Sequence, residues 1–318
     1  MKNNKKILVT GGSGFIGRNF INYLIKNTDN NIISLQKSID LKRKFNSKRV
    51  QVVEHDLTSP ISDKVAEKLL DVKSIVHLAG KSDIKNSFLN PEDYISNNIL
   101  SITNLINHFK NIPIEKMIHF STAEVFGPSL NNYRFSEQDL KTPKSPYALS
   151  KKQAEDVGDF YREQNNFPII TTYVMNVFGE GQCHDRYIPT LIKSINYDNS
   201  VDIHCDKKST TALSRNYLHV DDVCSAIYFL LKNGLPGERY NIVSKEYTDN
   251  LRLAETISQV LKKKLKYKLV ATSNNKQHAL SLLNGQKLWD MGWSPRKTLF
   301  DSLKEYTINS INNKEDFK

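Results

Sequence analysis

Short apolar runs rich in β-branched residues recur along the first half of the chain. Between most of them lie stretches in which apolar residues repeat with a helical period, such as FIGRNFINYLIKN (15–27) and NNILSITNLINHFK (97–110). The runs that we expect to form buried strands cover residues 5–11, 30–36, 49–56, 74–80, 116–122 and 168–176. Strands that alternate with helices predict a parallel sheet with helices on both faces, so the expected fold class is α/β.

The pattern loosens after residue 176. Residues 221–233, 250–265 and 298–311 have the period of helices, and residues 239–244 have the pattern of a short strand. The sequence contains no internal repeat and no long linker. We therefore expect the C-terminal third to pack against the sheet as a smaller lobe, with fraying over residues 312–318.

Composition narrows the class of protein. The chain has 318 residues, of which 39% are hydrophobic and 25% charged, so it can bury the core of an ordinary globular protein. No apolar run approaches the roughly 20 residues that span a bilayer, and the short run near the N-terminus leads directly into a glycine motif, which favours a first strand over a signal peptide. The three cysteines are scattered, as free thiols in a reducing compartment would be. We expect a cytoplasmic protein with no membrane partner.

The formal net charge of +11 could attract nucleic acid or a small anionic substrate. The Lys and Arg residues are spread along the chain, however, and no basic helix or RNA-binding motif stands out. The densest run, residues 262–264, closes a predicted helix, where cations interact favourably with the helix dipole. The pattern favours a solvated lysine-rich surface and no nucleic-acid partner.

A glycine motif, TGGSGFIGRNF, follows the first predicted strand directly. Its glycines Gly11, Gly14 and Gly17 permit a tight turn and a close backbone approach to a pyrophosphate, and the helix that follows offers amide donors and a favourable dipole. Because the motif stands between a strand and a helix, it predicts a dinucleotide site rather than a structural glycine turn.

The end of the second strand bears on the choice between NAD and NADP. Gln36 stands where a carboxylate usually binds the ribose hydroxyls, and Lys37 and Ser38 follow it. A cation and a hydroxyl suit a 2′-phosphate, which favours NADP, although a Lys37 that points to solvent explains the same residues. Asp56, after the third strand, could accept a hydrogen bond from an adenine amino group or cap a turn.

The strand over residues 116–122 ends in two hydroxyls, Ser121 and Thr122, and the helix that follows carries Tyr147 and Lys151. Tyr and Lys at positions i and i+4 share one face of a helix. A lysine ammonium near a phenol lowers the pKa of the phenol and lets it act as a base near neutral pH. A pair of this kind alone is usually structural, and its position after the hydroxyl-bearing strand is what favours chemistry.

With these motifs the chain resembles the extended short-chain dehydrogenases/reductases of the nucleotide-sugar epimerase/dehydratase type. The motifs, in the order of that family, are TGGSGFIG, HLAG (77–80), Asn98, STAEVFG, YALSK, MNVFGEG, SRNYLHVDDV (214–223) and MGWSP (291–295). The resemblance implies a Rossmann doubly wound parallel sheet, formed by residues 1–175 plus about 214–245. It also implies a smaller C-terminal substrate-binding lobe, formed by about 176–213 plus 246–318. The implied ligands are NAD or NADP and a nucleotide sugar, and the implied assembly is a homodimer formed through two helices of each subunit.

The resemblance also implies roles for single residues. Thr122 would hydrogen-bond the reacting sugar hydroxyl, Tyr147 would remove its proton while hydride passes to the nicotinamide, and Lys151 would hold the nicotinamide ribose. The implied cofactor-binding residues are Gly11, Gly14, Phe15, Ile16, Gly17, Gln36, Lys37, Asp56, Leu57, Leu78, Ala79, Gly80, Asn98, Ser121, Tyr147 and Lys151. The implied substrate-binding residues are Lys81, Thr122, Asn176 and Arg215, with Asn176 and Arg215 at the phosphates. A surface salt bridge is the alternative for Arg215.

Glu124 and Ala123 point to different reactions. In relatives that eliminate water across C5 and C6 of the sugar, a glutamate at this position removes the C5 proton, and an acidic or hydroxyl residue before it protonates the leaving hydroxyl. Here that neighbour is Ala123, as in simple 4-epimerases, although a glutamate could itself carry the proton to the departing oxygen. We expect transient oxidation at C4 by a 4,6-dehydratase with Glu124 as base, with a 4-epimerase or a 4-ketoreductase as alternatives. An ion pair at the sheet edge would be the structural explanation of Glu124.

Other features of the sequence argue against decarboxylation, a metal site and a non-catalytic role. Tyr173 stands where the family often has an arginine, and no arginine precedes GW at 292–293, which counts against decarboxylation of a uronic acid. The histidines have no metal-ligand spacing, so we expect no metal site. A non-catalytic, cofactor-sensing protein that binds a protein or RNA partner is a hypothesis of another class. The complete set of Thr122, Tyr147 and Lys151 argues against it.

Overall fold

A seven-stranded parallel sheet organises the chain in the computed structural model, which describes residues 5–40, 44–129, 132–205, 212–271 and 282–312. The strands are β1 (Lys6–Thr10), β2 (Asn31–Gln36), β3 (Val50–Glu54), β4 (Val72–His77), β5 (Lys116–Phe120), β7 (Ile169–Val174) and β12 (Arg239–Ile242). Their order is β12-β7-β5-β4-β1-β2-β3, and every neighbouring pair is parallel. The predicted α/β class and doubly wound sheet are confirmed.

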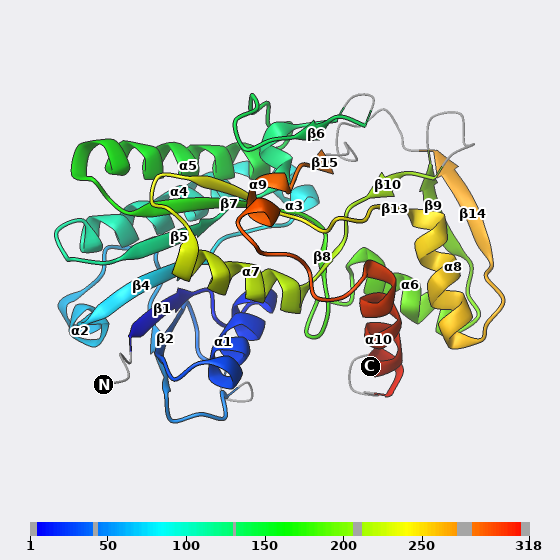
Figure 1. Cartoon of the computed structure of the whole chain (residues 1–318), viewed down its shortest axis with the longest axis horizontal. Coiled ribbons are helices and arrows are strands. Elements are labelled where there is room, and N and C mark those ends of the chain that lie inside the picture. The colour runs from blue at the N-terminus through cyan, green and yellow to red at the C-terminus, as the bar shows by residue number, and fades with distance from the viewer. Residues whose placement is uncertain (1–4, 41–43, 130–131, 206–211, 272–281, 313–318) are drawn as a thin grey trace.

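The central strands are apolar because helices cover both of their faces. In β7, all six residues are buried. Side chains alternate along β1, so that Ile7 and Val9 pack in one core cluster and Leu8 packs in another. The first cluster includes α1 (Phe15–Asn27) and α7 (Val220–Asn233), and the second includes α4 (Pro91–Phe109) and α5 (Pro146–Asn165). Figure 1 shows these two helix layers on opposite sides of the sheet.

A smaller lobe lies at the right of Figure 1, beyond the carboxyl ends of the strands. Its elements are α6 (Tyr187–Asn196), β9 (Val201–Cys205), α8 (Asn250–Leu261), β14 (Tyr267–Ala271) and α10 (Leu299–Asn312). The apolar faces of α6, β9, α8 and α10 meet in a separate core that contains Ile192, Leu253, Ile257 and Leu303. Strand β14 pairs with β9 at the outside of this core. The helices predicted over 250–265 and 298–311 are therefore present, with α8 ending at Leu261.

Short elements join these layers and shape the surface between them. They are α2 (Asp63–Ala66), η1 (Glu67–Leu69), α3 (Ile84–Leu89), η2 (Ala123–Phe126), β6 (Arg134–Phe135), β8 (Val177–Phe178), β10 (Ser214–Arg215), β11 (Leu218–His219), β13 (Thr248–Asp249), β15 (Leu282–Leu283) and α9 (Gln286–Asp290). Segment 214–245 contains α7, which packs on the sheet, and the edge strand β12. The chain therefore enters the small lobe at α6 and β9, returns to the sheet with α7 and β12, and enters the small lobe again at α8.

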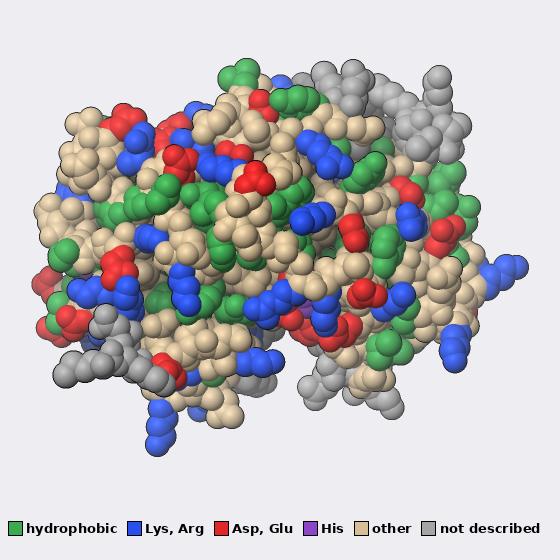
Figure 2. Space-filling view, viewed as in Figure 1, with side chains coloured by type: hydrophobic (Ala, Val, Ile, Leu, Met, Phe, Trp, Pro, Cys, Tyr) green, Lys and Arg blue, Asp and Glu red, His purple; other side chains and the backbone are tan. Residues whose placement is uncertain are grey.

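The topology fixes where a ligand can bind. The strand order reverses between β1 and β4, and in open parallel sheets the crevice outside the carboxyl ends at such a reversal is the binding site. Within the described ranges, no helix is long and apolar enough to cross a bilayer. On the face shown in Figure 2, Lys and Arg side chains are scattered among Asp and Glu side chains instead of forming one basic patch.

Candidate active site

The glycine turn joins β1 to α1 at the point where the strand order reverses. Gly11 has a φ of +70°, and a Cβ on it would lie 2.8 Å from the amide nitrogen of Ala79. A Cβ on Gly17 would lie 2.2 Å from the carbonyl oxygen of Gly11, so only glycine allows α1 to start this close to the turn. Gly14 is the N-cap of α1. The turn therefore forms a cradle at a helix N-terminus, which fits a pyrophosphate.

One cavity of about 640 Å³ begins at this turn and passes between the sheet and the small lobe. The predicted cofactor residues that line it are Gly11, Gly14, Phe15, Ile16, Gly17, Leu78, Gly80, Ser121, Tyr147 and Lys151. Ala79 lies between two of them, and its amide donates to Thr10 Oγ1 over 3.2 Å. The structure thus brings the glycine turn, the β4 end and the β5 end together.

Five other predicted cofactor residues are not part of the cavity lining, namely Gln36, Lys37, Asp56, Leu57 and Asn98. Asn98 is buried and donates its amide to Ser150 Oγ (2.8 Å) and to the Lys81 carbonyl oxygen (3.1 Å), while its own oxygen accepts from the Lys81 amide (2.8 Å). It therefore braces the Gly80–Lys81 turn against α5. Leu57 is buried in the core cluster under α4, where it packs with Val53.

An ion pair lies just beyond the ends of β2 and β3, between Lys37 and Asp56. Gln36 is buried and donates to Ser34 Oγ over 2.7 Å. The Lys37 ammonium lies 2.8 Å from the Asp56 carboxylate, and Asp56 also caps a turn by accepting from the Thr58 amide over 3.0 Å. The hydrogen bond from Lys37, followed by those from Thr58, lowers the pKa of Asp56 to about 2. The preference for NADP drawn from Lys37 is not supported, because the carboxylate that holds this ammonium would repel a 2′-phosphate.

The end of β5 presents its hydroxyls and Glu124 to the cavity. Thr122 is the N-cap of η2 and accepts from the Glu124 amide over 3.3 Å, which turns the chain so that Ser121, Thr122 and Glu124 all line the cavity. Ala123 points the other way, into a core cluster with Val125. Burial raises the pKa of Glu124, while the charge of Arg215 acts in the opposite direction. Glu124 is therefore a carboxylate of the cavity lining that binds a proton more readily than an ordinary glutamate.

Helix α5 carries Tyr147 and Lys151 into the same cavity. Its first turn is set by Pro146 at the first helical position and by the N-cap Ser145, whose Oγ accepts from the Ala148 amide over 3.1 Å. Burial raises the pKa of Tyr147 to about 12, against the effect of a hydrogen bond with Thr122, and burial lowers the pKa of Lys151 to about 8. Desolvation of the Tyr147 phenolate therefore outweighs the Thr122 hydrogen bond and the charge of Arg186, which both favour a lower pKa.

Residues from both lobes line the cavity. The predicted residues Lys81, Thr122, Asn176 and Arg215 all line it. Asn176 has a φ of +44°, and its amide donates to the Asn216 carbonyl oxygen over 2.9 Å, which holds the β7–β8 turn. Arg215 lies in β10, and its charge acts on Glu124 across the cavity lining.

Several lining residues were not identified from the sequence. They are Ser82, Ile84, Gln182, Cys183, Asp185, Arg186, Tyr187, His204, Tyr217 and Asn250, among others. Arg186 precedes α6 and pairs with Asp83 at the N-cap of α3 over 3.5 Å, so it reaches from the small lobe to the sheet domain. A loop rich in polar residues after MNVFGEG was the available signal, but its side chains meet α3 only through the tertiary fold.

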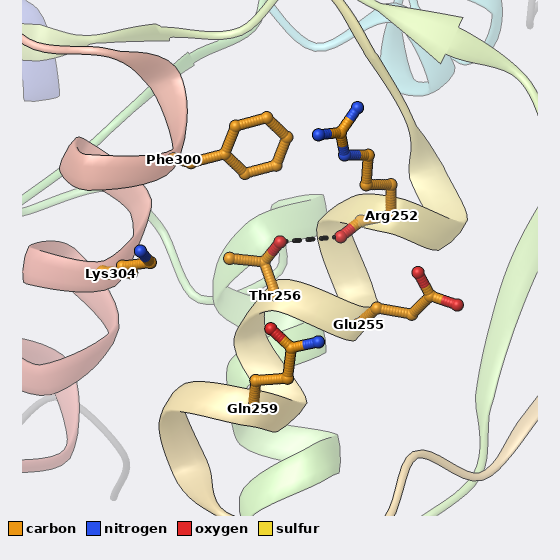
Figure 3. A pocket seen from close by; sticks show the side chains of 6 residues that line it. All are labelled: Arg252, Glu255, Thr256, Gln259, Phe300 and Lys304. Atoms are coloured by element: carbon orange, nitrogen blue, oxygen red, sulfur yellow. Dashed lines mark hydrogen bonds between the residues drawn. The ribbon is translucent and has the colours of Figure 1, made fainter.

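A second hollow lies between α8 and α10, away from the glycine turn. Figure 3 shows its lining side chains, with Arg252 beside the ring of Phe300, at 4.7 Å from the guanidinium carbon to the ring centroid. It contains none of the motif residues. In the part of the chain that the structure describes, no three His, Cys, Asp or Glu side chains gather in a way that could hold a metal ion.

Comparisons with known proteins agree with this geometry. Residues 7–243 match the model of the NAD dependent epimerase/dehydratase family. A dTDP-D-glucose 4,6-dehydratase of Bos taurus is 28% identical over 317 residues, which cover 95% of this chain and 87% of the relative. A crystal structure of a dTDP-glucose 4,6-dehydratase from Streptomyces venezuelae with NAD bound is 25% identical, with a TM-score of 0.86 and 98% of each chain covered. A UDP-glucuronic acid 4-epimerase from Bacillus cereus, in complex with UDP-glucuronic acid and NAD, is 25% identical, with a TM-score of 0.84 and coverage of 96% of this chain and 99% of that chain.

Proposed function

The chain belongs to the NAD dependent epimerase/dehydratase family, and from this premise we propose that it is a nucleotide-sugar 4,6-dehydratase that acts through transient oxidation at C4 of a hexose. The observation that carries the proposal is Glu124, a carboxyl that lines the cavity beside Thr122 and Tyr147 and whose pKa is raised by burial. A carboxylate with increased basicity at this place suits removal of a proton from carbon next to a ketone.

The cavity fits NAD because its glycine turn forms a cradle that a Cβ on Gly11 or Gly17 would fill. The turn residues would hold the pyrophosphate, and Lys151 would hold the nicotinamide ribose. When bound, NAD would supply the acceptor for the C4 hydride and would donate the same hydride to C6 after loss of water. We propose NAD in preference to NADP because the Lys37 ammonium is already paired with Asp56.

Oxidation at C4 rests on three side chains in this proposal. Thr122 orients the C4 hydroxyl, and Tyr147 accepts its proton. Because burial raises the pKa of Tyr147 to about 12, its phenolate needs stabilisation by nearby positive charge. The Lys151 ammonium provides positive charge for this purpose and is itself buried.

Elimination follows because the 4-ketone makes the C5 hydrogen acidic. Glu124 removes the C5 proton, the C6–oxygen bond breaks, and that proton leaves with the oxygen as water. The C5–C6 double bond that remains would then take the hydride at C6 and a proton from solvent, delivered through Glu124, at C5. No second acid is available at position 123, since the Ala123 methyl group lies in the core. Arg215 and Asn176 would meanwhile hold the diphosphate, as a guanidinium and an amide can.

A 4-epimerase is the second candidate, and Ala123 is the observation that favours it. Epimerisation needs the C4 chemistry of Tyr147 and Thr122 and no base at C5. In that case Glu124 would be a polar wall of the cavity.

Proton NMR of nucleotide hexoses incubated with the protein in deuterium oxide tests the two candidates. With UDP-, dTDP-, GDP- and CDP-hexoses as substrates, we expect loss of water and entry of deuterium at C5. Inversion at C4 without deuterium would establish the epimerase and contradict the dehydratase.

Glu124→Gln provides the matching variant test. We expect it to lower the dehydration rate by about 10²–10⁴-fold, the usual contribution of a general base. Asp185→Asn is the control, because Asp185 is another carboxyl of the cavity lining but is exposed. Equal dehydration rates in Glu124→Gln and the unmodified protein would remove Glu124 from the mechanism.

The same family membership leads us to propose two structural features. Residues 1–175 with about 214–245 would form the dinucleotide-binding domain, and about 176–213 with 246–318 the substrate-binding lobe. A homodimer would form through α4 and α5, whose outer surfaces carry the exposed apolar residues Leu100, Leu149 and Phe160.

A further inference from the structure

A buried carboxylate lies one helical turn after Lys151 on α5. Glu155 is 1% exposed, and side chains from three other parts of the chain surround it. Ser121 at the end of β5 donates its hydroxyl to Glu155 Oε1, and Tyr173 in β7 donates its hydroxyl to Glu155 Oε2 over 3.0 Å. A carboxylate in such surroundings requires compensation of its charge.

The compensation comes from a loop that is remote from the motifs. The Lys141 ammonium lies 2.8 Å from Glu155 Oε2, and the Lys141 side chain is only 15% exposed. The same ammonium lies 5.2 Å from the ring centroid of Tyr173. Lys141 thus reaches inward from the segment between β6 and α5 and closes a cluster of Lys141, Glu155, Tyr173 and Ser121.

We propose that Lys141 is a positioning residue for the catalytic site, which acts through its ion pair with Glu155 to hold the β5 end against α5 and to set the charge around the Lys151 ammonium. Two residues of the cluster, Ser121 and Glu155, connect it to the cavity. Ser121 lines the cavity directly and precedes Thr122. Glu155 shares its helix with Lys151 at the i+4 position, where side chains on one helix face are neighbours.

The charged and titratable groups around this cluster come from five elements. The Lys151 ammonium is influenced by Glu155 on the same helix, and it in turn influences His77 in β4 and His119 in β5. On the other side of Glu155, Arg239 in β12 interacts with Tyr173 and Glu155 and forms an ion pair with Asp159. Glu155 thus interacts with the cations Lys141, Lys151 and Arg239, and the ammonium of Lys141 forms an ion pair with its carboxylate.

The expected effect of each substitution has a definite sign. Glu155 raises the pKa of Lys151 against the larger effect of burial, which lowers it to about 8. Lys141→Met removes a nearby cation and leaves the Glu155 carboxylate less compensated, and both changes favour the charged form of Lys151. Its pKa should rise. Glu155→Gln removes the anion, so the pKa of Lys151 should fall.

Direct titration of Lys151 in the ligand-free protein tests the proposal. The protein is labelled with ¹³C at the lysine Cε position, and the Lys151 resonance is assigned from its loss in Lys151→Ala. A lysine that titrates near pH 8 is well separated from ordinary lysines at about 10.4. We expect a shift of roughly 0.5–1 pH unit upward in Lys141→Met and of similar size downward in Glu155→Gln.

Matched variants separate this effect from loss of structure. Lys141→Arg keeps the ion pair and should titrate like the unmodified protein, and Lys144→Met removes an exposed lysine of the same loop and should do the same. Should Lys141→Met fail to fold, Lys141→Gln has the same expected direction. An unchanged Lys151 pKa in folded Lys141→Met or Lys141→Gln, or shifts of equal sign in the Lys141 and Glu155 variants, would overturn the proposal.

The catalytic meaning of this inference rests on the proposed function, but its test does not. The titration uses no sugar and no cofactor, so a failure to turn over nucleotide hexoses leaves the result readable. Conversely, a dehydratase whose Lys151 is insensitive to Lys141 would contradict only the role of Lys141.

Discussion

At the scale of single residues, burial is the dominant influence on the chemistry of the cavity. It raises the pKa of Tyr147, lowers that of Lys151 and raises that of Glu124. All three groups are thus shifted toward their neutral forms before any ligand binds. The sequence identified these residues because each lies in a local motif. It did not identify Arg186 or Lys141, whose partners Asp83 and Glu155 are brought to them by the tertiary fold.

We expect the choice between NAD and NADP to depend on one ion pair, Lys37 with Asp56. We expect the protein to bind NAD more tightly than NADP, because Asp56, with its pKa lowered to about 2, is ionised at neutral pH and pairs with the Lys37 ammonium. Asp56→Asn frees Lys37 and should shift the affinity ratio toward NADP by roughly tenfold, the effect of about 1.4 kcal/mol. Cofactor titrations followed by calorimetry measure the ratio. Glu54→Gln, an exposed carboxylate at the end of β3, is the control. An unchanged ratio in Asp56→Asn would exclude this account.

At the scale of elements, the start of α5 determines where Tyr147 lies. Ser145→Ala removes the N-cap hydrogen bond to the Ala148 amide and should lower the free energy of unfolding by about 1 kcal/mol. Ser62 is the N-cap of α2 but makes no side-chain cap hydrogen bond, so Ser62→Ala should change it by less than about 0.5 kcal/mol. Urea denaturation of both variants measures the difference. Equal losses would mean that the Ser145 cap does not stabilise α5.

The adjacent strands β4 and β5 bury two stacked histidines. The rings of His77 and His119 lie 5.6 Å apart between centroids, and burial lowers the pKa of His77 to about 3 and that of His119 well below its ordinary value. Because the unfolded chain binds these protons near pH 6.5 and the folded protein does not, stability is full above that pH. It should decrease steadily as the pH falls from about 6.5 toward 3.

His119→Leu tests this linkage. Neither ring nitrogen of His119 has a hydrogen-bond partner among the described residues, so the substitution leaves no group unsatisfied. We expect the unfolding free energy at pH 7 to change by less than about 1.5 kcal/mol, and its decrease between pH 7 and pH 5 to become smaller. The urea midpoint at pH 7, 6 and 5 gives both quantities. If the unfolding free energy depends on pH equally in the unmodified protein and in His119→Leu, then His119 does not cause the loss of stability at low pH.

The sheet elements were predictable because burial on both faces produces continuous apolar runs. The strands and helices of the small lobe were harder for two physical reasons. All five residues of β14 are exposed, so no burial pattern marks it as a strand. Helix α6 follows a polar loop and contains Pro189 in its first turn, and β9 is only half apolar. The periodic, amphipathic helices α8 and α10 in the same lobe were predicted correctly.

At the scale of the whole molecule, the outer surface of α4 and α5 remains the predicted contact between two copies of the chain. Leu149 and Phe160 are three helical turns apart on α5 and are 41% and 57% exposed. We expect sedimentation at twice the monomer mass, and monomers after Phe160→Glu, because a carboxylate cannot be buried unpaired in an apolar contact. Leu235→Glu, at another exposed leucine, should leave the dimer intact. A monomer in the unmodified protein would contradict the prediction.

The position of β12 has a consequence for the newly synthesised chain. This strand closes the sheet next to β7, yet it is encoded after α6, β9 and α7. Residue 242 must therefore emerge from the ribosome before β12 can pair with β7. Until then the nascent chain carries an open, apolar strand edge, which is a template for pairing with other chains. A premature stop codon before residue 239 would make this state permanent, and truncated products should be substrates for chaperones and proteases instead of partly active enzymes.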